Sequence, residues 1–393
     1  MKILFLSRWF PYPANNGSKL RIFNLLRGLS QHHDVTLLSF ADQPEASSET
    51  PEIRSLCTDV QVVPWKEFDP HSWQARLGFL SLKPRSVIDT FSPEMAGKII
   101  QIINEKEPDL VIASQLPMAA YHKYFNGVPA LFEEIELGLS LENSRRGLNG
   151  KKRVRHAFTW YKLRMYLSRL LQSFRAITVV SEQERKLVSR YFPEVKKVFV
   201  IPNCMNLADY REIRSEPAPC RLVFTGSFRY HTNYEAMLWF VGEVFPLVLA
   251  QIPDAELVIS GDHANLPLPS DKNVTLAGYV DDIKGLIASS TVAIAPLWSG
   301  GGTRLKILEA MAIGTPVVAT SKGAEGLDAQ HGEHFFIADD PVAFSNYVIQ
   351  LLRDEDLRKT VGTKASLLVE EKYNWEKTFP AFVRSLETDL LYR

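Results

Sequence analysis

The strongest constraint in this sequence is an alternation of short apolar runs and amphipathic segments, which occurs twice. A continuous apolar run at 3–6 precedes a loop rich in Pro, Asn and Gly, then apolar residues at helical spacing over 22–29, then a second run at 35–40. Continuous apolar runs are typical of parallel strands that are covered on both faces. The first half of the chain therefore predicts β-loop-α-β units.

The alternation restarts after a polar stretch at 211–219 that contains Pro217 and Pro219. Two α/β halves that each begin with a strand predict two doubly wound, Rossmann-like domains facing a central cleft. We place the first domain at 1–210, the second at 211–375 and a final helix at 376–393. In the second half we expect strands at 221–225, 256–260, 274–276, 292–295 and 315–320, and helices at 233–249 and 303–313.

Composition narrows the class of protein. Of 393 residues, 45 are Lys or Arg and 45 are Asp or Glu, so the basic excess expected of a protein that coats nucleic acid is missing. The three cysteines, Cys57, Cys204 and Cys220, are too scattered for a disulfide framework or a CxxC metal site. No stretch approaches the ~20 apolar residues that span a bilayer. We expect a cytoplasmic enzyme with at most peripheral membrane contact.

A glycine-rich turn is the first candidate for chemistry. The strand predicted to end at Pro296 is followed by Gly300, Gly301 and Gly302 and then by a helix. In such a turn, backbone N–H groups can approach an anion at the positive end of the helix. Arg304 and Lys306 lie in the first turn, where cations oppose the dipole unless a phosphate offsets them. The alternative is an ordinary glycine turn with solvated charges.

The helix after this turn carries a family resemblance. The segment Glu309-Ala-Met-Ala-Ile-Gly-Thr-Pro-Val-Val closely resembles the C-terminal signature of retaining glycosyltransferases with the GT-B fold, the glycogen-synthase-like family 4. In that signature two Glu residues are separated by seven positions, and the second, here Glu309, binds the ribose of the nucleotide sugar. Gly301 stands where the first Glu would contact the donor sugar. The Gly-Gly-Gly-Thr-Arg-Leu-Lys variant resembles a subgroup of bacterial sugar transferases.

Further segments resemble the family in the same order along the chain. Residues 11–17 resemble the loop beside the donor phosphates, 201–206 resemble an Ile-Pro-Asn-Gly-Val-Asp turn, and 276–280 resemble the loop near the base. Segment 224–233 resembles the one that usually supplies an Arg and a Lys for the diphosphate, but Ser227 takes the Arg position. We infer that Arg304 and Lys306 compensate. The resemblance thus implies a donor site made of Gly17, Gly226, Arg229, Tyr279, Val280, Gly301, Gly302, Thr303, Arg304, Leu305, Lys306 and Glu309.

The catalytic residues are implied less directly. In enzymes of this kind the departing diphosphate helps to activate the acceptor, and electrostatic stabilisation of the diphosphate carries much of the rate. Related enzymes place a His or an acid after the strand that here ends in Glu133-Glu134-Ile135-Glu136. Glu134 and Glu136 are our candidates for contact with the sugar or acceptor. The alternative is a set of solvated acids at a strand end. We interpret the pair at 281–282 as a helix cap and expect no metal or other cofactor.

A basic segment stands apart from these motifs. Residues 151–175 contain eight Lys or Arg residues and no acid. A basic amphipathic helix of this kind can lie on an anionic membrane surface. It can equally pack on its own domain and leave its cations solvated. The apolar residues interleaved with the cations are Trp160, Tyr161, Leu163, Tyr166, Leu167, Leu170 and Leu171.

Together these features predict a metal-independent, retaining glycosyltransferase. It would move a sugar from a nucleotide-diphosphate sugar to a glycan or lipid-linked acceptor in cell-envelope or exopolysaccharide synthesis, in the cytoplasm or at the inner face of the membrane. By the resemblance, the helix at 376–393 crosses back to the first domain. Two alternatives stay open: a nucleotide-sugar epimerase of the same fold, and a sugar-binding or scaffold protein without catalysis. No nucleic acid partner is expected.

Overall fold

The computed structural model describes residues 1–14, 16–138, 141, 150–210, 212–213, 215–269, 271–300 and 304–388. The chain forms two compact units, Met1–Pro202 with Phe379–Arg393, and Asn203–Thr378. The predicted domain boundary after residue 210 differs from this division. Residues 203–210 belong to the second unit because the Met205 amide donates to the Tyr373 carbonyl (2.6 Å) and the Trp375 amide donates to the Met205 carbonyl (3.1 Å).

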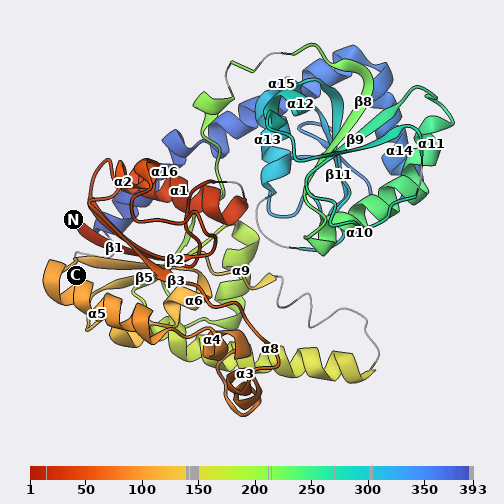
Figure 1. Ribbon diagram of the computed structural model, residues 1–393. Helices are drawn as coiled ribbons and strands as arrows, with labels where there is room; N and C mark the ends of the chain where they lie inside the picture. The colour runs from red at the N-terminus through yellow and green to blue at the C-terminus, as the bar shows by residue number, and fades with distance from the viewer. Residues whose placement is uncertain are drawn as a thin grey trace. The chain divides into compact units, whose positions relative to one another are not determined.

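The first unit contains a parallel sheet of seven strands within the described residues, in the order β3-β2-β1-β4-β5-β6-β7 (Figure 1). From β1 the chain adds β2 and then β3 on one side, and it then returns to add β4 to β7 on the other side of β1. The order of the strands therefore reverses between β1 and β4. In doubly wound folds, ligands bind at the carboxyl ends of the strands beside such a reversal. The strands are β1 (Lys2–Ser7), β2 (Asp34–Ala41), β3 (Asp59–Pro64), β4 (Leu110–Ser114), β5 (Ala130–Glu133), β6 (Ala176–Val179) and β7 (Val198–Val200).

Helices of the first unit begin at recognisable caps. The Asn16 side chain accepts from the Lys19 amide at the start of α1, and Ser92 does the same for Met95 at the start of α5. The helical spacing over 22–29 is confirmed, because its apolar residues are buried in α1. The elements are α1 (Gly17–Leu29), α2 (Pro51–Arg54), α3 (Trp73–Leu77), η1 (Gly78–Leu80), α4 (Arg85–Asp89), α5 (Pro93–Lys106), α6 (Gln115–Ala119), η2 (His122–Tyr124), α8 (Gly150–Leu170), η3 (Leu171–Ser173) and α9 (Glu182–Tyr191).

The second unit repeats this topology with a parallel sheet of six described strands, in the order β10-β9-β8-β11-β12-β13. The direction of connection reverses between β8 and β11. Strand β8 begins three residues before the predicted strand at 221–225 and pairs with both β9 and β11. The strands are β8 (Ala218–Thr225), β9 (Glu256–Ser260), β10 (Val274–Gly278), β11 (Ser290–Ala295), β12 (Val317–Ala319) and β13 (Phe336–Ile337). Two doubly wound α/β units are therefore confirmed.

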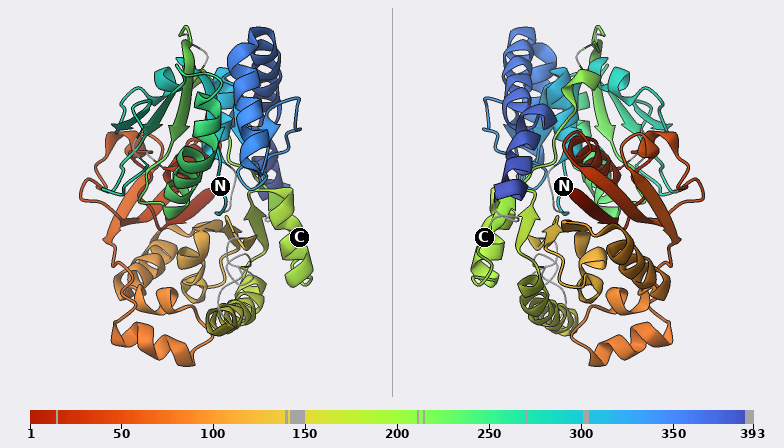
Figure 2. Two further views of the ribbon diagram at one scale, coloured as in Figure 1. Left: turned by 90° about the vertical axis from the view of Figure 1, so that its right-hand side faces the viewer. Right: turned by 90° about the vertical axis from the view of Figure 1, so that its left-hand side faces the viewer.

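Helices of the second unit cover its sheet, and α14 and α15 pack against each other (blue in Figure 2). Helix α13 ends at Gly314, whose φ of 87° is a left-handed conformation that glycine adopts freely. The elements are η4 (Leu207–Asp209), α10 (His231–Trp239), the π-helical turn η5 (Phe240–Val244), α11 (Phe245–Leu249), α12 (Ile283–Ala288), α13 (Leu305–Ile313), α14 (Pro341–Arg353), α15 (Glu355–Lys372) and α16 (Trp375–Leu386). The last of these contributes its residues from Phe379 onward to the first unit.

Helix α8 bears out the packed-helix alternative on one of its sides, and membrane contact stays a prediction. Tyr166, Leu167, Leu170 and Leu171 are buried in the core of the first unit, as the packed-helix alternative requires. Tyr161 is exposed, however, so packing accounts for only one side of the helix. Among the residues that the structure describes, no helix is both long and apolar enough to cross a bilayer.

Candidate functional site

The candidate donor site lies where β8, β9 and β11 of the second unit end. Gly226 follows β8 directly, and its amide donates to the Ser260 carbonyl (3.0 Å). Its φ is 153°, and a Cβ at this position would lie 2.7 Å from the Asn233 amide nitrogen and 2.9 Å from Lys306 Nζ. Only glycine fits here, because the loop backbone passes directly over the Lys306 ammonium group.

Lys306 is the central cation of this site. Its Nζ donates to Asn233 Oδ1 (2.9 Å) and lies 4.1 Å from the centre of the Phe224 ring. Burial, together with the neighbouring Arg304, lowers the pKa of Lys306 to about 7. Both causes penalise the charged form, so an anion bound beside Lys306 would favour its protonation.

Arg304 is the residue just before α13, and its guanidinium is directed at the loop rather than at solvent. Its Nη2 donates to the carbonyls of Gly300 (2.9 Å) and Lys322 (3.2 Å). Gly300 has a φ of 95°, which favours glycine. The structure therefore places one of the two expected phosphate-binding cations within hydrogen-bonding distance of the glycine turn. Gly301, Gly302 and Thr303 lie outside the described residues.

Glu309 lies one turn further along α13. Tyr210 donates its hydroxyl hydrogen to Glu309 Oε1 (3.2 Å). Burial raises the pKa of Glu309, while Tyr210, Lys284 and Lys306 partly counter this effect. The carboxylate is thus positioned and polarised, and its other oxygen is a suitable acceptor for the hydroxyl groups of a ribose.

The remaining predicted donor residues of the second unit are more exposed. Arg229 pairs with Asp262 at the surface, and Tyr279 is 83% exposed. Val280 and Leu305 are half-buried. The structure therefore gathers Gly226, Lys306 and Arg304 closely, with Glu309 next to them along α13, and leaves Arg229 in a surface ion pair.

A second charged cluster lies at the carboxyl ends of the strands of the first unit. Arg21 on α1 is almost fully buried, and its Nε donates to Glu133 Oε1 (2.7 Å). Its Nη1 donates to the Ile201 carbonyl (2.8 Å), and Ser114 donates its hydroxyl to Glu133 Oε2 (2.8 Å). Arg21 is not among the predicted site residues, because its position in α1 resembles that of an ordinary surface cation. The hypothesis of solvated acids is wrong for Glu133.

Glu134 extends this cluster toward solvent. Gln115 Nε2 donates to its Oε2 (2.8 Å), and Arg21 Nε lies 3.9 Å from its Oε1. Its φ is 60°, and its amide donates to Thr178 Oγ1 (2.9 Å), which fixes this unusual backbone conformation. Burial and the adjacent Glu133 raise the pKa of Glu134 to about 7.

The other two predicted residues of the first unit differ from Glu134. Glu136 is exposed, so it lies outside the buried cluster. Gly17 begins α1, next to Ser18, whose hydroxyl accepts from Gln115 Nε2 (3.3 Å). The structure therefore brings Gly17 near Glu134 through Gln115, while the predicted residues of the second unit form their own group.

A cavity of about 550 Å³ opens beside this cluster, at the carboxyl ends of β1 and β3. The Arg8 guanidinium carbon lies 3.7 Å from the centre of the Trp9 ring and 4.3 Å from that of Trp65. Phe68 lines the same cavity. The signal that could have revealed it is the position of Arg8-Trp9 directly after the first strand, where doubly wound folds bind ligands.

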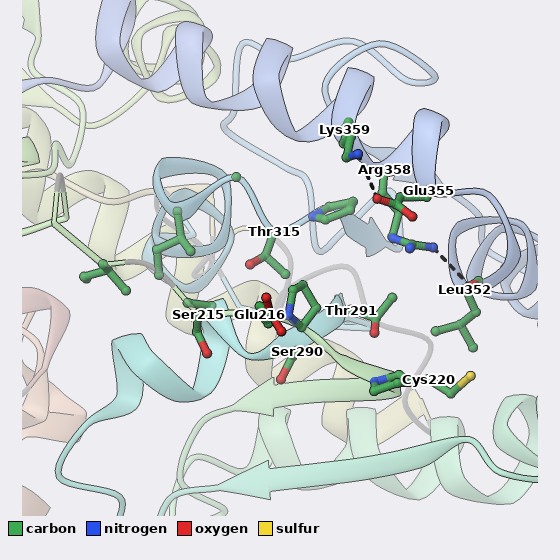
Figure 3. Close-up of a pocket in the computed structure, with 17 residues that line it drawn as sticks. Ser215, Glu216, Cys220, Ser290, Thr291, Thr315, Leu352, Glu355, Arg358 and Lys359 are labelled. Atoms are coloured by element: carbon green, nitrogen blue, oxygen red, sulfur yellow. Dashed lines mark hydrogen bonds and ion pairs between the residues drawn. The ribbon is translucent and has the colours of Figure 1, made fainter.

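A larger cavity, of about 870 Å³, lies elsewhere in the second unit (Figure 3). It is lined by residues at the amino-terminal starts of β8 and β11, such as Cys220 and Ser290, and by α15. Three of its charged residues already have partners, since Lys359 contacts Glu355 (2.7 Å) and Arg358 donates to the Leu351 carbonyl (2.7 Å). None of the predicted site residues lines it, so its size does not make it the donor site.

The acidic pair at 281–282 is a helix cap, as predicted. Asp282 Oδ1 accepts from the Gly285 amide (2.8 Å) at the start of α12. Within the described ranges, no group of three or more His, Cys, Asp or Glu side chains is placed to hold a metal ion. Metal independence stays a prediction.

Two family profiles match most of the chain. The profile described as Glycosyltransferase Family 4 matches residues 15–209, and the one described as Glycosyl transferases group 1 matches residues 219–354. A Klebsiella pneumoniae relative, named as an uncharacterized 44.6 kDa protein in the cps region, is 22% identical and covers 98% of this chain and 99% of its own length.

Solved structures share the fold over nearly the whole chain. Sucrose-phosphate synthase from Thermosynechococcus elongatus aligns with a TM-score of 0.69 at 16% identity, covering 98% of both chains. HepE from Anabaena, solved in complex with UDP, aligns with a TM-score of 0.68 at 16% identity, covering 99% of this chain and 100% of its own. The chain is therefore an enzyme, and it belongs to the GT-B glycosyltransferases of the family 4-like type.

Proposed function

We propose that this glycosyltransferase uses a nucleotide-diphosphate sugar as donor and transfers the sugar, with retention, to a glycan or a lipid-linked acceptor. The observation that carries the donor assignment is the pair of cations at the carboxyl end of the second sheet. Lys306 and Arg304 lie beside a glycine turn, and the pKa of Lys306 is lowered to about 7 by burial and by Arg304. A diphosphate is the partner that would relieve both the desolvation and the repulsion.

The proposal also names contacts for the ribose and the base of the donor. Glu309 is held by Tyr210 one turn beyond Lys306, and it would accept hydrogen bonds from the ribose hydroxyls. Backbone groups of the loop at 279–280 would contact the base. The UDP in the HepE structure supports a nucleoside diphosphate as the ligand class.

The acceptor is assigned to the cavity of the first unit. Trp9 and Trp65 line this cavity, with the Arg8 guanidinium stacked on both rings, and aromatic rings beside a hydrogen-bond donor suit sugars with polar substituents. Glu134 accepts from Gln115, the residue before the cavity-lining Leu116, and its pKa is raised to about 7 by burial and Glu133. It can therefore accept a proton or a hydrogen bond from the acceptor hydroxyl at neutral pH.

Catalysis would then rest on charge stabilisation. As the bond between the sugar and the diphosphate breaks, negative charge builds on the diphosphate, where Arg304 and Lys306 are already oriented. Attack by the acceptor on the same face of the sugar gives retention. No metal or other cofactor is required by this scheme, because the two cations supply the positive charge.

The pathway and the location are part of the same proposal. We assign the enzyme to cell-envelope or exopolysaccharide synthesis in the cytoplasm, with peripheral contact to an anionic membrane through the basic helix α8. The relative named for the cps region of Klebsiella pneumoniae supports a placement among such genes. An acceptor linked to lipid would explain why the helix is basic and free of acids.

A panel of UDP-, GDP-, ADP- and dTDP-sugars tests the donor assignment. One of these at ~100 times its dissociation constant stabilises the protein by about 2.7 kcal/mol, which is visible as a rise in melting temperature. Release of free nucleoside diphosphate that depends on an added acceptor identifies a transferase. Interconversion of the sugar without acceptor would identify an epimerase, and binding without turnover would identify a scaffold. Failure of every donor to stabilise the protein would contradict the proposal.

A further inference from the structure

An exposed apolar surface on the first unit is unexplained by its core or by its cluster of charges. Trp73 and Leu77 of α3 are 69% and 54% exposed, and Phe79 and Leu80 of η1 are 60% and 90% exposed. Four large apolar side chains exposed within eight residues exceed the scattered exposure that is normal for a protein surface. Gathered apolar exposure of this kind marks an interaction site.

Helix α8 adds a second row of exposed apolar side chains. Val154, Phe158 and Tyr161 are exposed and follow the four- and three-residue spacing that aligns side chains on one face. The buried residues Tyr166 and Leu170 lie on the opposite face and pack into the core. The helix therefore has two apolar faces, and only the inner one is used in folding.

The two rows are joined. Lys162 Nζ of α8 donates to the carbonyls of Gly78 and Phe79, both at 3.0 Å. Arg85 of α4 covers the Phe79 ring at 4.1 Å. Figure 1 shows α3 and α4 beside α8. We call Trp73, Leu77, Phe79, Leu80, Val154, Phe158 and Tyr161, with the cations around them, the apolar–basic surface.

The charge of this surface has a single sign. Residues 70–88 contain no acid, and neither do residues 151–175. Arg76, Lys83, Arg153 and Arg155 are exposed, and within the described residues none of the four forms an ion pair. An apolar centre with cations at its edge matches a bilayer that carries anionic headgroups.

We propose that the apolar–basic surface docks the enzyme on an anionic bilayer, with α3 and η1 entering the boundary between headgroups and acyl chains. Aromatic residues such as Trp73 and Phe79 suit that boundary, and the cations on α8 suit the headgroups. This deepens the proposed membrane contact, which it locates on α3 and η1 as well as on α8. The proposed surface also lies next to the acceptor cavity in the sequence, since Phe68, which precedes α3, and Ser86 and Val87, which belong to α4, line that cavity.

Sedimentation of the full-length protein with vesicles tests this proposal. The vesicles contain phosphatidylcholine alone or phosphatidylcholine mixed with phosphatidylglycerol. Leu77→Ser/Phe79→Ser/Leu80→Ser should weaken binding to the mixed vesicles more than tenfold. Arg76→Gln/Lys83→Gln/Arg153→Gln/Arg155→Gln should weaken it by up to several hundredfold, since each cation near the surface contributes roughly fivefold, and should remove most of the salt dependence.

A matched control comes from the second unit. Val342 and Leu367 are 59% and 58% exposed, so Val342→Ser/Leu367→Ser removes equally exposed apolar side chains outside the surface. This variant should bind vesicles as the parent does. Equal binding by the control and by the Leu77, Phe79 and Leu80 variant would overturn the proposal. So would a parent dimer that this variant dissociates in sedimentation velocity, because a second copy would then cover the surface.

Trp73 gives a direct measure of insertion. Brominated lipids should quench part of the parent's tryptophan fluorescence. The Trp73→Phe variant should still bind the vesicles but should no longer show this quenching. Unchanged quenching in Trp73→Phe would overturn the insertion of α3. Stabilisation by nucleotide sugars is measured on the same proteins without vesicles, so failure of the donor proposal and failure of the docking proposal are told apart.

Discussion

The two units place opposite excesses of charge at the carboxyl ends of their sheets. In the first unit, one cation, Arg21, faces two carboxylates, Glu133 and Glu134. In the second unit, two cations, Arg304 and Lys306, are near one carboxylate, Glu309. In both cases burial and a like-charged neighbour move the pKa of one residue to about 7, Glu134 upward and Lys306 downward.

This difference supports the proposed assignment of the donor diphosphate to the second unit and of the acceptor hydroxyl to the first. The second unit has a surplus positive charge whose cost falls when an anion arrives, as expected for a diphosphate site. The first unit has a surplus carboxylate that can exchange a proton near neutral pH, as expected for a residue near a reacting hydroxyl. Under the proposed function, the same fold would supply a site for a charged group in one half and a site for proton transfer in the other.

The largest effect is expected from Glu134→Gln. Loss of a group that accepts a proton from the acceptor should lower kcat by roughly 10²–10⁴-fold. In the parent, turnover should fall as the pH drops below 7, because Glu134 becomes protonated. The dissociation constant of the donor should be unchanged. Glu136→Gln, which removes an exposed acid two residues away, is the control and should keep activity. A Glu134→Gln enzyme with the parent's kcat and pH profile would remove Glu134 from the mechanism.

Arg21→Met should reduce stability by about 3–5 kcal/mol, because it leaves buried carboxylates without their cation. Without Arg21 the pKa of Glu134, which burial and Glu133 already raise, should rise further above its value in the unfolded chain. The deficit should therefore be greatest above neutral pH and shrink as the pH falls toward 5. Denaturant unfolding of this variant and of Arg27→Met, an exposed cation on the same helix, measures it. A deficit as small as that of Arg27→Met would mean that the cluster does not hold the first unit together.

Lys306→Met should weaken binding of a nucleoside diphosphate roughly 10- to 100-fold, the usual range for a hydrogen bond to a charged group. The empty protein should be as stable as the parent or more so, because a desolvated ammonium is removed. Calorimetric titration and a melting curve test both statements. Lys364→Met, in which the lost cation pairs with Glu333 at the surface, should leave both values unchanged. Unchanged affinity in Lys306→Met would separate Lys306 from the diphosphate.

Much of the fold was predictable from local pattern. The apolar run at 3–6 marked the centre of β1, the strand predicted at 256–260 matches β9, and the helix predicted at 303–313 ends where α13 does. The Asp282 cap follows from side-chain chemistry. The boundary between the units was predicted after residue 210 but lies after Pro202. The difference arises because the pairing of Met205 with Asn374 joins residues that are far apart in the sequence. Spacing along the chain carries no information about such contacts.

The candidate site residues were also predictable only where they lie close together in the sequence. The glycine turn, Arg304, Lys306 and Glu309 are close in sequence and were found together. Arg21 escaped notice because it is 112 residues from Glu133, and only the folded sheet brings the two side chains into contact. The exposed face of α8 was also ambiguous, since a helix with apolar residues on two sides has a weak amphipathic pattern.

Proton uptake on donor binding tests the charge comparison most directly. At pH 7.5 about three-quarters of Lys306 is neutral if its pKa is about 7, and a bound diphosphate should restore its proton. A nucleotide sugar is the right ligand, because its diphosphate does not titrate near this pH. Calorimetric titrations in buffers of different ionisation enthalpy should show uptake of up to roughly three-quarters of a proton by the parent and close to none by Lys306→Met. Binding by the parent without proton uptake would contradict the assignment of the second unit's surplus charge to the diphosphate.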